Sequence, residues 1–214
     1  MIKAVIFDYG NVVSLTQTGD CADEMEKMTG IPANIFRSVY DKFRFEFDRG
    51  TIDGAELYRQ LLADAGYIEQ SKDTEMLKKI ALMDMQSWRA YHKDVCDWAL
   101  SLQKEGFKIG VLSNMPTEFL TYYEKEIPIF NFADYACFSC RVKLIKPEEA
   151  IYRVCLDGLG IKAEEGVFFD DIQENIDAGN KVGLHACLWT GLDKAKEDFA
   201  SIIASTKSTN GAQK

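Results

Sequence analysis

The segment AVIFDYGN, residues 4–11, decides the fold. Its first four residues are apolar and the run stops at Asp8, which is typical of a buried parallel strand that delivers a polar side chain at its carboxyl end. Later segments repeat this pattern: residues 108–112 before Ser113-Asn114, residues 166–169 before Asp170-Asp171, residues 185–189 before Thr190 and, more weakly, residues 135–138.

Helical patterns separate the later strand candidates. Apolar residues recur at helical spacing over residues 95–102, 147–159, 173–182 and 193–204, with Pro147 expected as the first helical residue of its segment. Strands that alternate with helices predict an α/β fold with right-handed crossovers. We therefore expect a Rossmann-like three-layer core built on a parallel sheet.

The segment from residue 15 to residue 89 contains no strand candidate. Aromatic and aliphatic residues recur there at helical spacing, for example over residues 35–47 and 55–62. This predicts a helical bundle inserted after the first strand, here named the helical cap. The expected domains are a core of residues 1–14 and 90–207, a helical cap of residues 15–89 and a flexible tail of residues 208–214.

The composition restricts the partners. The 214 residues include 34 acidic and 25 basic side chains, which gives a formal charge of -9. Nucleic-acid binding depends on clustered Lys and Arg, so the acidic excess argues against such a partner but not against a small phosphorylated ligand. No apolar run is long enough to span a membrane and the N-terminal residues lack a signal-peptide pattern, so we expect a cytoplasmic protein without a membrane partner.

The six cysteines are expected to be reduced, in line with that compartment. Cys137 and Cys140 form a single C-x-x-C pair without the second pair or the histidines that a zinc site requires. We interpret them as core residues, and a redox or metal role stays open.

Polar residues gather where the predicted strands end. Ligands bind at the carboxyl ends of strands in an open parallel sheet, so Asp8, Ser113-Asn114 and Asp170-Asp171 are expected at one site, with Lys146 beside them. Three adjacent carboxylates repel one another unless a cation offsets them, and a hard divalent ion such as Mg²⁺ suits oxygen ligands. The same set suits phosphoryl transfer, with a carboxylate nucleophile opposite a hydroxyl, an amide and an ammonium group.

The segments FDYGN, LSN, KP and FFDD resemble the four ordered motifs of the haloacid dehalogenase superfamily. Their spacing also fits, with 105 residues from Asp8 to Ser113, 33 to Lys146 and 24 to Asp170. The closest similarity is to small sugar-phosphate phosphatases that include α-D-glucose-1-phosphate phosphatase, and the phosphatase half of epoxide hydrolases is more distant. The resemblance covers residues 1 to about 204.

This resemblance implies a phosphoric monoester hydrolase that acts on small phosphorylated metabolites, with sugar phosphates such as glucose 1-phosphate favoured. Asp8 would form an aspartyl-phosphate and bind Mg²⁺ together with the Gly10 carbonyl and Asp171, with Asp170 in support. The remaining roles are phosphate binding by Gly10, Asn11, Ser113, Asn114 and Lys146, of which Lys146 also steadies the nucleophile.

One position departs from the motif. Most phosphatases of the superfamily carry a second Asp two residues after the nucleophile, which protonates the leaving oxygen, and here that residue is Gly10. The proton then comes from water or from the helical cap, where Asp48, Glu46 and His92 are candidates of equal rank. A leaving group of low pKa, such as an anomeric oxygen, is affected least.

Two other functions stay open. Without the acid, the chain could be a catalytically weak phosphate-sensing or partner-binding protein, and a haloacid dehalogenase would leave the Asp170-Asp171 pair unexplained because those enzymes need no metal. Arg44, Arg49 and Trp88 of the cap are candidates for substrate specificity, although both arginines have acids beside them to pair with. The sequence does not indicate an oligomeric state.

Overall fold

The computed structural model describes residues 1–16 and 21–211. Five parallel strands form one sheet in the order β3-β2-β1-β4-β5. The strands are β1 (Ala4–Phe7), β2 (Lys108–Ser113), β3 (Tyr135–Phe138), β4 (Gly166–Asp170) and β5 (His185–Leu188). The predicted Rossmann-like α/β fold is confirmed, including the weaker strand candidate at residues 135–138.

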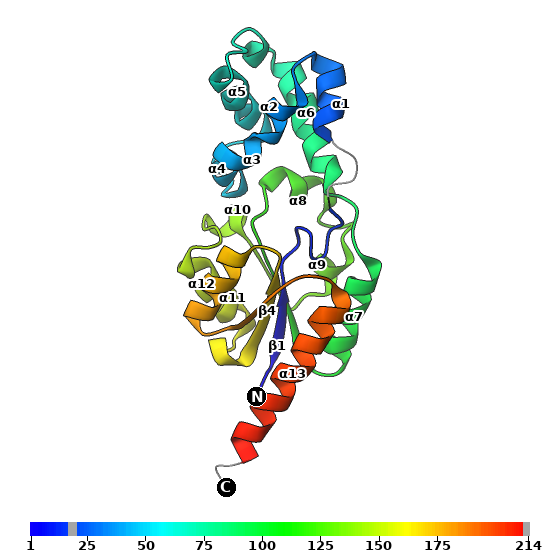
Figure 1. The fold of residues 1–214 in the computed structure, drawn as a ribbon, viewed down its shortest axis with the longest axis vertical. Coiled ribbons are helices and arrows are strands. Elements are labelled where there is room, and N and C mark those ends of the chain that lie inside the picture. Colours follow the sequence, from blue (N-terminus) through cyan, green and yellow to red (C-terminus); the bar gives the residue numbers. More distant parts are fainter. Residues whose placement is uncertain (17–20, 212–214) are drawn as a thin grey trace.

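Helices cover both faces of the sheet (Figure 1). One face carries α11 (Glu149–Leu159) and α12 (Gln173–Val182), and the other carries α7 (Lys93–Lys104) and α13 (Leu192–Gly211). All four residues of β1 are fully buried, because the strand lies in the middle of the sheet with helices on either side. A strand in this position is apolar on both faces, as residues 4–7 are.

The register of the sheet assembles the site. Phe7 pairs with Val111 of β2 on one side and with Phe169 of β4 on the other. Asp8 continues β1 by one residue, and its backbone N–H donates to the Phe169 carbonyl over 2.9 Å. The residues that end these three neighbouring strands therefore lie together at the carboxyl edge, as the topology requires.

The helical cap lies above this edge, opposite the N-terminus and the far end of α13 (Figure 1). Its helices are α1 (Cys21–Thr29), α2 (Ala33–Arg37), α3 (Val39–Lys42), α4 (Arg44–Asp48), α5 (Gly54–Asp64) and α6 (Thr74–Ser87). Buried apolar side chains such as Phe36, Tyr58 and Leu61 fill its interior. The remaining elements are α8 (Thr117–Tyr123), α9 (Pro128–Phe132), α10 (Ser139–Val142) and 3₁₀ turns at Gln70–Lys72 and Ala163–Glu165. The division into domains at residues 14 and 89 stays a prediction.

Two helix limits differ from those expected. The helix after Lys146 begins at Glu149 instead of Pro147, because the Glu148 N–H donates to the Ile145 carbonyl and closes a turn over Lys146 and Pro147. The last helix runs to Gly211, into the segment predicted as a tail; residues 212–214 of that segment lie outside the described residues. Within the described part of the chain, no helix combines the length and the apolar character that crossing a membrane demands.

Candidate active site

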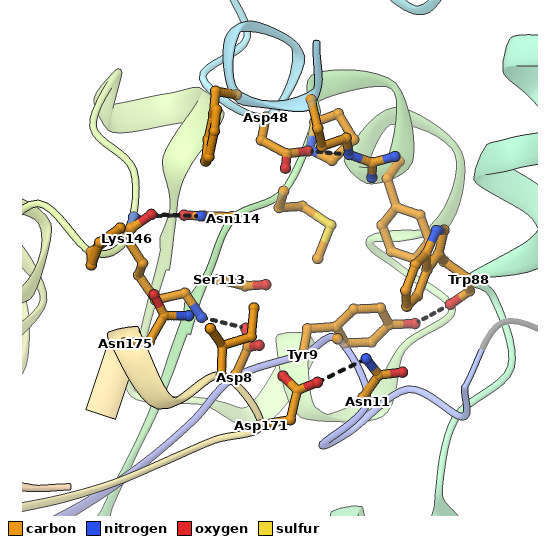
Figure 2. Close-up of a pocket in the computed structure, with 18 of the residues that line it drawn as sticks. Asp8, Tyr9, Asn11, Asp48, Trp88, Ser113, Asn114, Lys146, Asp171 and Asn175 are labelled. Carbon is orange, nitrogen blue, oxygen red and sulfur yellow. Dashed lines mark hydrogen bonds and ion pairs between the residues drawn. The ribbon is translucent and has the colours of Figure 1, made fainter. Parts of the chain in front are cut away.

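Three carboxylates meet at the carboxyl edge of the sheet. Oxygen atoms of Asp8, Asp170 and Asp171 lie within 4.8 Å of one another. The Lys146 ammonium joins them, with its Nζ atom 2.8 Å from Asp8 Oδ1 and 2.5 Å from Asp170 Oδ2. Apart from Asp171, which is half-buried, these side chains are buried. The residues predicted from the strand ends therefore do come together (Figure 2).

Asp170 is saturated with hydrogen bonds. Its Oδ1 accepts from the Ile172 N–H at 2.8 Å, and the Asn175 amide donates to both of its oxygens at 2.9 and 3.0 Å. Its Oδ2 also faces Lys146. Asp170 thus positions Lys146, and its predicted supporting role at a metal ion stays a prediction. Asn175 is not among the site residues predicted from the sequence. Its place in the first turn of α12, which follows Asp170-Asp171, was the one signal that pointed to it.

The charges of the cluster do not balance, because three carboxylates face one ammonium. Burial raises the pKa of Asp8 to about 7; Lys146 opposes this shift, and Asp170 and Asp171 add to it. Burial also raises the pKa of Asp171. For Lys146, burial acts to lower the pKa, but Asp8 and Asp170 outweigh it and raise the pKa. A divalent cation would relieve the excess negative charge.

The turn after β1 supplies further oxygen atoms. Asn11 has a left-handed backbone (φ 54°), which Asn tolerates better than most residues, and its Nδ2 donates to Asp171 Oδ2 over 2.9 Å. The Asn11 Oδ1 atom is buried and has no hydrogen-bond partner in the described part of the chain. Asp8, Asp171 and this turn form an oxygen-rich donor set that fits Mg²⁺ better than a soft metal. Among the described residues, no other cluster of acids, cysteines or histidines has such a geometry.

Ser113 and Asn114 end β2 with different contacts. Ser113 is buried and its hydroxyl group points into the site in Figure 2. The Asn114 side chain instead pairs with the backbone of Lys146: its Oδ1 accepts the Lys146 N–H at 2.8 Å, and its Nδ2 donates to the Lys146 carbonyl at 3.0 Å. These hydrogen bonds hold Lys146 at the site, and Asn114 also lines the cavity, so its predicted role in phosphate binding stays a prediction.

A cavity of about 370 Å³ separates the acidic cluster from the helical cap. Its roof comes from the cap and its floor from the strand ends, and most of its wall is apolar. The residues in contact with it include Asp8, Gly10, Asn11, Ser113, Asn114, Lys146 and Asp171 from the core, together with Arg44, Phe45, Asp48, Met85 and Trp88 from the cap.

The three predicted specificity residues of the cap have different locations. Arg44 and Trp88 line the cavity. Arg49 does not: its Nη2 lies 2.8 Å from Glu148 Oε1 and its Nη1 donates to the Lys143 carbonyl at 3.1 Å. The prediction that Arg49 meets the substrate is therefore wrong, because these contacts direct its guanidinium to the loop before α11.

The structure also separates the three candidates for the missing acid. Asp48 is buried and lines the cavity. Glu46 is exposed and accepts a hydrogen bond from the Thr51 hydroxyl at 2.6 Å, and His92 precedes α7, 3.9 Å from Asp94. Neither Glu46 nor His92 contacts the cavity.

The fold and the site together define an α/β protein with a buried cluster of carboxylates and one lysine beneath a helical cap. The family model of haloacid dehalogenase-like hydrolases matches residues 2–183, and the chain belongs to this family. It is therefore a hydrolase of the haloacid dehalogenase superfamily.

Two of the relatives that the chain matches have low sequence identity to it. The chain is 24% identical over 203 residues to bifunctional epoxide hydrolase 2 of Mus musculus, which covers 86% of this chain and 35% of the mouse protein. It is 23% identical over 157 residues to flavin mononucleotide hydrolase 1 of Arabidopsis thaliana, with 73% of this chain and 60% of the plant protein covered. The chain thus spans less than two thirds of either relative.

Among solved structures, a haloacid dehalogenase family enzyme of Bacteroides thetaiotaomicron in complex with magnesium and inorganic phosphate superposes with a TM-score of 0.68. Its sequence is 19% identical, and the match covers 88% of this chain and 94% of that one. This similarity supports the fold.

Proposed function

We propose that the protein is a Mg²⁺-dependent phosphatase that hydrolyses small phosphomonoesters through a phosphorylated Asp8. The observation that carries this proposal is the contact of Lys146 with both Asp8 and Asp170, beside a half-buried Asp171. Asp8, Asp171 and the Gly10 carbonyl would hold the ion. When bound, Mg²⁺ would neutralise the phosphate so that an anionic carboxylate can approach it.

The side chains of the site divide the remaining work. Lys146 holds Asp8 Oδ1, so that the other carboxylate oxygen is directed to the cavity and attacks phosphorus while the bond to the leaving oxygen breaks. The Ser113 hydroxyl and Lys146 would donate hydrogen bonds to the phosphoryl oxygens as charge redistributes. Water then attacks phosphorus, which releases phosphate and regenerates the Asp8 carboxylate.

The favoured substrates are sugar phosphates such as glucose 1-phosphate. The sequence motifs resemble those of sugar-phosphate phosphatases, and the cavity volume of about 370 Å³ suits a small metabolite. The names of the relatives add an organic phosphate, flavin mononucleotide, and the Bacteroides structure adds magnesium with phosphate.

The test is release of p-nitrophenol from p-nitrophenyl phosphate by the purified protein. We expect release that requires Mg²⁺, stops with a chelator and is abolished in Asp8→Asn. Phosphate release from a panel of phosphorylated metabolites, with glucose 1-phosphate included, then ranks the substrates. Phosphate binding without turnover at any Mg²⁺ concentration would overturn the proposal and favour a phosphate-sensing protein.

A further inference from the structure

We infer that Asp48 of the helical cap donates the proton to the leaving oxygen, a role that Gly10 has no side chain to fill. The inference rests on the proposed phosphatase function. Asp48 lies outside the four sequence motifs. It is the candidate acid that lines the cavity, whereas Glu46 and His92 do not.

The first argument is position. In an in-line displacement the leaving oxygen departs from the face of phosphorus opposite the nucleophile. Asp8 forms the floor of the cavity and Asp48 its roof, so the leaving oxygen is directed to Asp48 (Figure 2). The other acid that lines the cavity outside the cluster is Glu174, an exposed residue of α12 close to Asp171 in sequence, on the core side of the cavity.

The second argument is how firmly Asp48 is held. Its backbone carbonyl accepts a hydrogen bond from the Ser139 hydroxyl at 2.5 Å, and the same Ser139 oxygen accepts the Met115 N–H at 2.8 Å. Met115 follows Ser113 by two residues. A residue of the cap is thereby attached to the core loop that carries the predicted phosphate-binding hydroxyl, so its distance from the phosphate is fixed.

The Asp48 side chain is also oriented. Arg44 Nε donates to Asp48 Oδ1 at 2.8 Å, and Arg44 Nη1 donates to Asp84 Oδ2 at 3.0 Å. Oδ1 is therefore committed to Arg44, whereas the second oxygen points into the cavity in Figure 2. With only 8% of its surface exposed, Asp48 presents a single oxygen to the substrate.

The third argument is charge. The charged groups that face Asp48 are Arg44 on the same helix, Asp84 on α6 and Lys146 on the core. Burial raises the pKa of Asp48, Arg44 and Lys146 oppose this shift, and Asp84 adds to it, with a net rise. Two buried carboxylates thus share one guanidinium, and a bound phosphate dianion would add further negative charge. Both conditions favour a proton on Asp48.

The proposed step balances. As the bond from phosphorus to the leaving oxygen breaks, the proton of Asp48 passes to that oxygen, which leaves a neutral alcohol and an Asp48 carboxylate paired with Arg44. In the second half-reaction this carboxylate accepts a proton from the attacking water, whose oxygen bonds to phosphorus while the bond from phosphorus to Asp8 breaks. Phosphate is released, and the Asp8 carboxylate and the Asp48 acid are restored.

The experiment compares leaving groups in Asp48→Asn, which retains a carbonyl oxygen for Arg44 and lacks the acidic proton. For glucose 6-phosphate, whose primary alcohol needs protonation, kcat/KM should fall by about 100-fold or more, within the range of general-acid catalysis. For p-nitrophenyl phosphate, whose phenolate leaves unaided, kcat/KM should change by less than about 3-fold. The variant should also show a burst of p-nitrophenol, because water attack on the phosphoenzyme is slowed.

The pH profile is a further readout. With glucose 6-phosphate, the wild-type kcat/KM should decline as pH rises and Asp48 loses its proton, and this limb should be absent in Asp48→Asn. Glu46→Gln changes an exposed acid of the same helix and is the control, with both substrates unaffected. Equal losses for both substrates in Asp48→Asn, or no loss for either, would overturn the inference.

A rescue variant protects against a purely structural effect. A Cβ atom at Gly10 would lie 3.8 Å from Asp8 Oδ2, an ordinary van der Waals contact, so a substitution there starts without a clash. Gly10→Asp in the Asp48→Asn background should restore most of the activity on glucose 6-phosphate, and an absence of rescue would count against a lost proton.

If wild type hydrolyses p-nitrophenyl phosphate and Asp8→Asn does not, the proposed function stands whatever Asp48 does. An inactive wild type would overturn both.

Discussion

Lys146 is the residue on which the electrostatics of the site depend. It is buried between Asp8 and Asp170, at 2.8 and 2.5 Å. Removing one member of a buried ion pair strongly destabilises a protein, because the remaining charge stays out of water without compensation. The Lys146 ammonium therefore serves the fold as well as the proposed chemistry.

The prediction for this residue is a loss of stability in Lys146→Met. The free energy of unfolding, measured by urea denaturation of the metal-free protein, should fall by about 3–5 kcal/mol, with a smaller loss at acidic pH where the carboxylates are protonated. Lys93→Met breaks an exposed pair with Asp97, which water and salt screen, and should lower the free energy of unfolding far less. Similar losses in the two variants would contradict the role assigned to Lys146.

Arg44 and Arg49 show what the sequence leaves undetermined about single residues. Both lie in an aromatic, acid-rich segment, and nothing in that pattern separates them. The structure places Arg44 between Asp48 and Asp84 at the cavity and Arg49 on Glu148. Asp84 is 40 residues from Arg44 in sequence. Glu148 is 99 residues from Arg49. Contacts of this range follow from how the cap docks, which local spacing does not encode.

At the scale of single elements, the helices of the cap depend on their first residues. Asp53 precedes α5, and its Oδ1 accepts the Glu56 N–H at 2.8 Å. This bond satisfies one of the N–H groups that a helix leaves unpaired at its start. Asp73 does the same for α6 through the Met76 N–H at 3.0 Å.

We predict that Asp53→Ala lowers the free energy of unfolding by about 1 kcal/mol, because the helix loses its cap. Asp53→Asn keeps an accepting oxygen and should stay within about 0.5 kcal/mol of wild type. Chemical denaturation of both variants measures the difference. If the Asn variant were as destabilised as the Ala variant, the charge of Asp53, and not its hydrogen bond, would be what stabilises α5.

The elements of the core were predictable because their patterns are local. Residues 4–7 and 135–138 are strands with the expected limits, and α12 covers residues 173–182 as expected. The strand ends then indicated Asp8, Ser113 and Asp170-Asp171 through topology alone. The short helices α2, α3 and α4 have four or five residues each and no pattern long enough to give their limits. Asp48 lies in α4, one of these short helices, so the sequence did not predict its location. The contacts of Asn114 are hydrogen bonds to Lys146, which is distant in sequence, and were not predictable either.

For the molecule as a whole, the protonation of the acidic cluster should control both the stability of the fold and the proposed binding of Mg²⁺. The pKa of Asp8 is about 7 in the fold, against an ordinary value of 3.8, so the folded state holds this proton more tightly than the unfolded chain does. The free energy of unfolding of the metal-free protein should therefore fall as pH rises between these two values and level off above them. Burial raises the pKa of Asp171 in the same direction.

In the proposed function, Mg²⁺ has to displace that proton when it binds, so its binding should strengthen as pH rises. We predict that a fixed excess of Mg²⁺ raises the Tm more at about pH 8 than at about pH 6, since a ligand at free concentration L stabilises the fold by RT ln(1 + L/Kd), which grows as Kd falls. Asp8→Asn removes the titrating group and should make the Mg²⁺ shift both smaller and less dependent on pH. Glu69→Gln, an exposed acid of the cap, should behave as wild type. An equal Mg²⁺ shift at both pH values in wild type would mean that the ion binds without displacing a proton from Asp8, and hence that the three carboxylates are already ionised in the metal-free fold.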